Sequence, residues 1–247
     1  MCNFFSCIVK KNGEVVWDSA IDNHSELVEL GKIQDDTADT AKMKFARVEI
    51  TPPDGDVFSP LEKWILKIDE TITPDWFKKR HEDVAWSALK ECLKEVLIYQ
   101  KKIKELNKKR CWIKNSEIES IEGGTVESIE GGTVKSIRGG TVESIWGGTV
   151  KSIWGGTVKS IKGGTVKYIK GGTVESIWGG TVKGIRGGTV KSIWGGTVES
   201  IEGGTVTIYN NCLPKKMSGN YIIINKSGEN PIILTGNKNI KIEYTEV

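Results

Sequence analysis

Residues 123–206 read GGTVESIE GGTVKSIR GGTVESIW GGTVKSIW GGTVKSIK GGTVKYIK GGTVESIW GGTVKGIR GGTVKSIW GGTVESIE GGTV, one octapeptide repeated with few changes. A helix would rotate successive octapeptides by about 80° and spread the Val and Ile positions around its surface. The β-branched residues instead favour strands, and each Gly-Gly pair is typical of a turn. The tract therefore predicts a β-solenoid, with Val and Ile in interior ladders and the variable positions outside.

The spacing within the octapeptide predicts a bend. Val126 and Ile129 are three residues apart, so one straight strand could not turn both side chains inward. We expect a bend near Glu127-Ser128, where a serine hydroxyl can bond to backbone groups. The two exceptions at the serine position, Tyr168 and Gly184, fit a partly exposed site.

The length of one coil is left open by the repeat, which allows two or three octapeptides per turn. Two octapeptides per turn would align four lysines in an unfavourable column of like charge, namely Lys135, Lys151, Lys167 and Lys183. Three per turn would pair some glutamates with lysines but would also stack other lysines. We favour two octapeptides per turn.

The flanking segments predict two further regions around a solenoid at 111–206. Residues 1–110 read as an α+β domain with a hairpin at Asn12-Gly13 in a type I′ turn and a short helix over 25–30. Strands are expected over 43–51 and 64–69. A long helix should begin at Thr73-Pro74-Asp75 and end near Arg110. Its expected apolar stripe is Ala85, Leu89, Cys92, Val96, Tyr99, Ile103 and Leu106.

Solenoids need end caps, because an open last coil exposes unpaired backbone groups. Residues 207–247 are expected to form a β-rich C-terminal cap, with candidate strands at 221–225, 231–235 and 240–244. At the other end, the long helix and Trp112-Ile113 are expected to form the cap.

Charge and hydropathy exclude several classes of protein. The 35 basic and 32 acidic residues leave a net charge of +3, which argues against a nucleic-acid partner. No apolar run reaches the roughly 18–20 residues of a membrane helix, so no membrane partner is expected. The first residues do not resemble a signal peptide. We expect an intracellular protein, in a host cytoplasm or associated with a virion.

Metal and cofactor sites are not expected. The five cysteines have no CxxC spacing, and the two histidines, His24 and His81, are not in ligand-like spacing. The sequence carries no P-loop, nucleophile elbow or dinucleotide-binding motif. One enzymatic alternative is a hydrolase in which Cys2 becomes an N-terminal nucleophile after removal of Met1.

The position before each Gly-Gly pair supplies the candidate binding residues. It carries tryptophan at four places, Trp146, Trp154, Trp178 and Trp194, and Glu, Lys or Arg elsewhere. Exposed tryptophans on a rigid ladder can bind a protein or stack on a glycan. The structural alternative is that each ring lies across its neighbours and stacks on an adjacent Lys or Arg.

Outside the tract, four segments carry a family resemblance: SCIVKKNGEVVWD at 6–18, IDNHSELVE at 21–29, FARVEITPPDGDVF at 45–58 and TPDWF at 73–77. Together with the GGTV octapeptides, they resemble a group of phage and prophage proteins with a small N-terminal domain and a tandem GGTV tract. The resemblance implies a viral setting and no catalytic residues. We therefore expect a non-enzymatic structural or protein-interaction scaffold, acting through self-association or a protein partner; the alternative is a glycan- or small-ligand-binding module.

Overall fold

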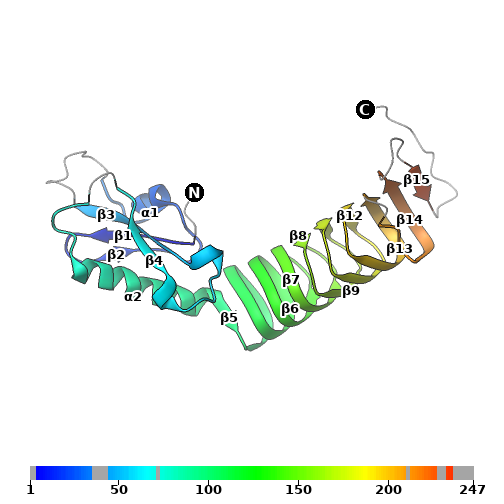
Figure 1. The fold of residues 1–247 in the computed structure, drawn as a ribbon, viewed down its shortest axis with the longest axis horizontal. Helices are drawn as coiled ribbons and strands as arrows, with labels where there is room; N and C mark the ends of the chain where they lie inside the picture. Colours follow the sequence, from blue (N-terminus) through cyan, green and yellow to red (C-terminus); the bar gives the residue numbers. More distant parts are fainter. Residues whose placement is uncertain (1–3, 35–43, 71–72, 210–211, 227–231, 236–247) are drawn as a thin grey trace. The chain divides into compact units, whose positions relative to one another are not determined.

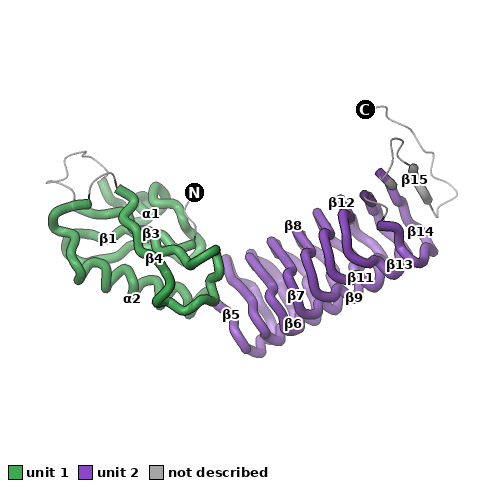
Figure 2. Tube along the Cα trace, in the orientation of Figure 1, with its two compact units in different colours: residues 1–96 green, residues 97–247 purple. Residues whose placement is uncertain are grey.

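A computed structural model of the chain describes residues 4–34, 44–70, 73–209, 212–226 and 232–235. It divides into two compact units, residues 1–96 and 97–247 (Figure 2). The first unit holds a small antiparallel sheet with two helices, and the second is a parallel β-solenoid that ends in a strand cap (Figure 1). The predicted fold class is therefore confirmed.

The N-terminal sheet has the order β2-β1-β3-β4, and all neighbours are antiparallel. Its strands are β1 (Phe5–Lys10), β2 (Val15–Val16), β3 (Phe45–Thr51) and β4 (Ile65–Ile68). Two short 3-10 turns, η1 (Pro53–Gly55) and η2 (Leu61–Lys63), lie between β3 and β4. Because α1 (His24–Leu30) and α2 (Lys79–Val96) both pack on it, β1 is buried along almost its whole length.

The hairpin is present, but the predicted turn type is wrong. The Gly13 N–H donates to the Lys10 carbonyl (2.8 Å), and Gly13 alone in this turn has a positive φ, of 91°. A type I′ turn needs positive φ at Asn12 as well. The Asn12 side chain instead accepts from the Glu14 N–H (3.0 Å), which leaves the left-handed residue at the bulge position after an ordinary turn.

The short helix α1 is confirmed, and the Asn23 side chain caps it by accepting from the Ser25 N–H (2.9 Å). The predicted start of the long helix is wrong. Residues 74–77 form a turn closed by the Phe77 N–H and the Pro74 carbonyl (2.9 Å), and α2 begins at Lys79. Its first turn is capped by the His81 ring, whose Nδ1 accepts from the Lys78 N–H (3.0 Å).

The predicted end of the helix near Arg110 is also wrong, because α2 ends at Val96. Residues Leu97–Tyr99 form β5, which pairs in parallel with Trp112–Lys114, so Trp112 and Ile113 belong to a coil and do not cap it. Ile98 and Leu106 are buried in the solenoid core. The compact solenoid unit thus begins at residue 97, whereas the sequence placed its start at 111.

The strands of successive coils in the solenoid pair in parallel (Figure 1). Their bounds are β6 (Lys102–Ile137), β7 (Thr141–Ile153), β8 (Thr157–Ile161), β9 (Thr165–Ile169), β10 (Thr173–Ile177), β11 (Thr181–Ile185), β12 (Thr189–Ile193) and β13 (Thr197–Ile208). Thr141 pairs with Thr157 and Thr149 with Thr165, so one coil contains two octapeptides. This confirms the favoured coil length.

The interior of the solenoid is a stack of Val and Ile. From Val126 to Ile208 these side chains are at most 3% exposed. Burial of both Val and Ile confirms the predicted bend between them. Several serine hydroxyls at the bend donate to the preceding coil, as from Ser144 to the Glu127 carbonyl (3.1 Å) and from Ser192 to the Glu175 carbonyl (2.8 Å).

Both glycines of a pair are required by the corner. At Gly163, a Cβ would lie 2.4 Å from the Trp146 carbonyl oxygen of the preceding coil. At Gly164, φ is 72°, a conformation that favours glycine, and a Cβ would lie 2.6 Å from the Gly148 carbonyl oxygen. The first glycine therefore permits close approach, and the second also permits the turn.

The C-terminal end carries the expected strand cap. β14 (Lys216–Asn225) continues the parallel pairing on β13, and β15 (Ile232–Thr235) adds to β14 in antiparallel fashion. Two of the three candidate strands are thereby confirmed. The third, at 240–244, lies outside the described residues, as does Cys2.

Candidate functional site

The position before each Gly-Gly pair lies at a corner, and the coil of two octapeptides sorts these positions into two columns. The first corner column is Glu130, Trp146, Lys162, Trp178, Trp194 and Tyr209. The second corner column is Glu122, Arg138, Trp154, Lys170, Arg186 and Glu202. The structure thus brings together three of the predicted tryptophans and places Trp154 in the other column.

The first corner column contains a continuous aromatic stack. The rings of Trp178 and Trp194 lie 5.5 Å apart, and those of Trp194 and Tyr209 lie 4.1 Å apart, each pair within 10° of parallel. Tyr209 joins this stack because its N–H donates to the Ile193 carbonyl (2.8 Å), just as the Trp194 N–H donates to the Ile177 carbonyl one coil earlier. Sequence reasoning missed Tyr209, because it falls after the last Gly-Gly pair.

The remaining tryptophans stack on cations. The Lys162 ammonium lies 3.9 Å from the centre of the Trp146 ring, and the Lys170 ammonium lies 4.0 Å from that of Trp154. Such contacts are worth about 0.5–1 kcal/mol at exposed sites. The expected stacking on neighbours is therefore present, and in each column the next coil covers one face of the ring.

The tryptophans nevertheless remain accessible. Trp146 and Trp154 are each 54% exposed and Trp178 is 56% exposed, whereas Trp194 is half-buried within the stack. Trp194 has a ring on each side, whereas Trp146, Trp154 and Trp178 each have one face covered by the next coil. Trp146 also borders a surface hollow of about 410 Å³ lined by Glu130, Gly131 and Gly147.

Tyr168 and Gly184 occupy the serine position in neighbouring coils and face each other in register. A Cβ on Gly184 would lie 3.2 Å from the Tyr168 ring, so the missing side chain leaves room for the tyrosine. The Arg186 guanidinium then lies over the Tyr168 ring, 4.0 Å from its centre. The two exceptions to the repeat are therefore one packing unit.

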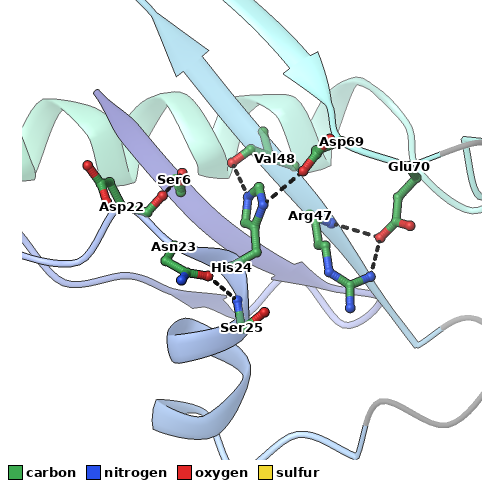
Figure 3. Close-up of polar contacts among 9 residues, drawn as sticks. All are labelled: Ser6, Asp22, Asn23, His24, Ser25, Arg47, Val48, Asp69 and Glu70. Carbon is green, nitrogen blue, oxygen red and sulfur yellow. Dashed lines mark hydrogen bonds and ion pairs between the residues drawn. The ribbon is translucent and has the colours of Figure 1, made fainter. Parts of the chain in front are cut away.

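The N-terminal unit holds a polar cluster around His24 (Figure 3). His24 Nε2 lies 3.2 Å from the Val48 carbonyl oxygen, and Nδ1 lies 3.2 Å from Asp69 Oδ2. A neutral imidazole can donate to only one of these oxygens, whereas the doubly protonated ring donates to both. His24 therefore connects the start of α1 to β3 and to the end of β4.

The sequence did not predict this grouping. Among the described residues, His24, Glu49 and Asp69 form a set of metal-ligand types, with one donor atom from each within 4.8 Å of the others. The hydrogen bond between His24 and Asp69 accounts for the close approach of those two side chains. Nearby, Glu70 pairs with the half-buried Arg47 (2.9 Å), so Asp69 and Glu70 both have structural partners.

Two of the described cysteines, Cys7 and Cys111, are buried in the core. Burial raises the pKa of the Cys7 thiol above its ordinary range. Burial also raises the pKa of Cys111 to about 12, aided by the charge of Glu127 and opposed by that of Lys108. Thiols of this kind stay protonated near neutral pH and are poor nucleophiles.

A second hollow, of about 480 Å³, opens at the start of the solenoid. Its charged lining is largely paired, as in the contacts of Lys102 with Glu117 (3.1 Å) and of Lys135 with Glu119 (2.6 Å).

No helix in the described part of the chain is long and apolar enough to cross a membrane.

No protein-family model matches the chain, and no match is found among curated proteins or solved structures.

Proposed function

We propose that this chain is a non-enzymatic interaction scaffold of the phage or prophage type, which binds a protein partner or a second copy through the corner columns of its solenoid. The observation that carries the proposal is the exposure of Trp146, Trp154 and Trp178, each more than half accessible on a regularly hydrogen-bonded backbone. Tryptophan is enriched among residues that dominate binding energy at protein interfaces. The phage setting rests on the sequence resemblance alone.

The geometry favours a protein over a glycan as the partner. Sugars stack on the flat faces of aromatic rings, whereas here Trp194 lies between Trp178 and Tyr209 and a lysine occupies one face of Trp146 and one face of Trp154. Protein side chains can instead pack against exposed ring edges and into the hollow beside Trp146. We therefore place a glycan- or small-ligand-binding module second to a protein-binding scaffold.

The strand cap favours binding along the side of the solenoid. β14 pairs with the last coil, and β15 pairs with β14, so the edge of the repeat tract is covered at this end. End-to-end addition of another solenoid would have to displace these strands. If the protein self-associates, the corner columns are the more suitable surface.

Two measurements test the proposal. Sedimentation velocity over a dilution series detects self-association, and affinity capture with quantitative mass spectrometry detects a host or phage partner. The Trp146→Ala/Trp178→Ala/Trp194→Ala variant should lose the oligomer or the captured protein. A Thr157→Ala/Thr173→Ala variant, which changes outward positions that belong to neither corner column, should keep it. The proposal would be contradicted if the parent protein is a monomer and captures the same set of proteins as the tryptophan variant.

A further inference from the structure

The two flat faces of the solenoid differ in charge. The cationic face consists of the strand segments that begin at Thr133, Thr149, Thr165 and Thr181, and the same face continues in register at Thr197. The mixed face consists of those that begin at Thr125, Thr141, Thr157, Thr173 and Thr189. The outward position two residues after the threonine is Lys in the four segments from Thr133 to Thr181 and Glu199 in the segment from Thr197, whereas it is Glu or Lys on the mixed face.

Ion pairs neutralise the mixed face. Lys159 pairs with Glu143 in the preceding coil (2.7 Å), and Lys191 pairs with Glu175 (3.2 Å). Since the same position accepts Glu in some octapeptides and Lys in others, the backbone does not require a lysine there. The choice of residue at this position is therefore free to serve something other than the fold.

The cationic face keeps its charge. Lys135 pairs with Glu119 at the start of the column (2.6 Å). Within the described residues, Lys151, Lys167 and Lys183 have no carboxylate within ion-pair distance. They lie in register on neighbouring strands, which are about 4.8 Å apart. Like charges placed directly opposite each other destabilise a sheet, so the column costs stability that a glutamate would recover.

The adjoining second corner column extends the positive surface and adds aromatic rings. Lys170 and Arg186 lie beside the lysine column, together with the rings of Trp154 and Tyr168. The three octapeptides at 149–156, 165–172 and 181–188 contain no acidic residue. Closely spaced cations beside aromatic rings are what proteins use to bind single-stranded nucleic acid, with the cations on phosphates and the rings on bases.

We propose that the cationic face binds a single-stranded nucleic acid, whose phosphates follow the column from Lys135 to Lys183 and whose bases contact Trp154 and Tyr168. This goes beyond the proposed scaffold function and shares only Trp154 with it, because the stack of Trp178, Trp194 and Tyr209 lies along the first corner column. It reverses the sequence-based expectation of no nucleic-acid partner, which rested on the small net charge of the whole chain.

The test is fluorescence anisotropy with a labelled oligothymidine of about twenty nucleotides, long enough for one binding face. The Lys167→Gln/Lys183→Gln variant should weaken binding by about tenfold or more and lower the salt dependence by about 1.4, since each lost phosphate contact contributes about 0.7. The matched control, Lys159→Gln/Lys191→Gln, removes the same charge from the mixed face and should change the affinity less than threefold.

A second variant tests the aromatic contribution. Tyr168→Ser/Gly184→Ser restores the consensus octapeptide and removes no charge, and it should weaken oligothymidine binding several-fold while leaving heparin binding unchanged. Thermal unfolding by circular dichroism checks that each variant folds, and the lysine-face variant should be no less stable than the parent. Equal losses in both lysine variants would overturn the proposal. So would no binding at low salt, or a preference for heparin that is insensitive to Tyr168.

Discussion

At the scale of single residues, the corner of each coil depends on the absence of two β-carbons. Substitution at the second glycine of a pair both strains the backbone and creates a clash with the preceding coil. Gly164→Ala should therefore lower the free energy of unfolding by about 2–3 kcal/mol or more, measured by denaturant titration. Gly13 is a control, since its φ is 91° but a Cβ would have open space. Gly13→Ala should cost about 1 kcal/mol.

The Tyr168 and Gly184 pair predicts a coupling that can be measured. Gly184→Ser alone should be destabilising by about 1–3 kcal/mol, because the new side chain meets the Tyr168 ring. Tyr168→Ser together with Gly184→Ser should recover most of that loss. A double-mutant cycle by thermal or chemical unfolding should give a coupling energy above about 0.5 kcal/mol. Additive effects would show that the two positions do not share one packing space.

Burial of the thiols predicts a reactivity pattern. A pKa of about 12 leaves about one part in ten thousand of Cys111 as thiolate at pH near 8. Peptide mapping after N-ethylmaleimide treatment should find Cys7 and Cys111 unlabelled in the folded protein and labelled in guanidinium chloride. Because the folded-state pKa of Cys111 is raised, its contribution favours folding below pH 9.0 and is lost as the pH rises toward about 12.

At the scale of single elements, the repeat made the interior ladder, the bend and the corner columns predictable from sequence. The errors lie where the repeat fades. Val96, Tyr99, Ile103 and Leu106 have helical spacing, but Leu97–Tyr99 pairs with Trp112–Lys114, which is a non-local interaction that local periodicity cannot reveal. Similarly, Thr73-Pro74 resembles a helix start, but packing of the Trp76 and Phe77 rings against His81 places a turn there instead.

The candidate sites were predictable to a lesser degree. The tryptophan positions followed from the repeat, whereas Tyr209 and the His24 cluster depend on residues distant in sequence. The charge of each face depends on coil length, which the sequence left open. The sequence therefore identified the lysine column only as an unfavourable feature of a coil of two octapeptides. Its position beside the second corner column follows from the strand register.

The interior ladder predicts a large difference between inward and outward positions of one strand. Ile177 is 1% exposed and lies between the isoleucines of the coils before and after it. Ile177→Ala should lower the free energy of unfolding of the solenoid by about 2–5 kcal/mol. Thr173→Ala, in the same strand but facing outward, should cost less than about 1 kcal/mol. Urea titration followed by circular dichroism compares the two, and equal costs would argue against the buried ladder.

At the scale of the whole molecule, the solenoid is a stack in which each coil contacts its neighbours, so its length can change without altering the remaining interfaces. Deletion of residues 157–172 removes one full coil and keeps the later octapeptides on their original faces. Deletion of 157–164 removes half a coil and moves every later octapeptide to the other face. Both variants should fold, with strand-rich circular dichroism spectra.

Their surfaces should differ. The longer deletion removes four lysines but leaves Lys135, Lys151 and Lys183 in one column. The shorter deletion removes only two lysines but places Glu175 next to Lys151. Oligothymidine binding should therefore be weaker in the 157–164 deletion than in the 157–172 deletion, although the 157–164 deletion loses less positive charge. The opposite order would indicate that overall charge, and not the arrangement on one face, determines the affinity.

The pairing of octapeptides into coils also has a consequence for inheritance. Near-identical repeats in a gene are prone to gain or lose copies when the DNA is replicated or recombined. In this fold, a change by an even number of repeats lengthens or shortens a surface whose pattern is kept. A change by an odd number moves every later octapeptide to the other face. Each face then combines the first part of its own residue pattern with the last part of the other face's pattern, and no residue of the buried ladder is substituted. New surfaces can therefore arise in this fold through a change in the number of repeats alone.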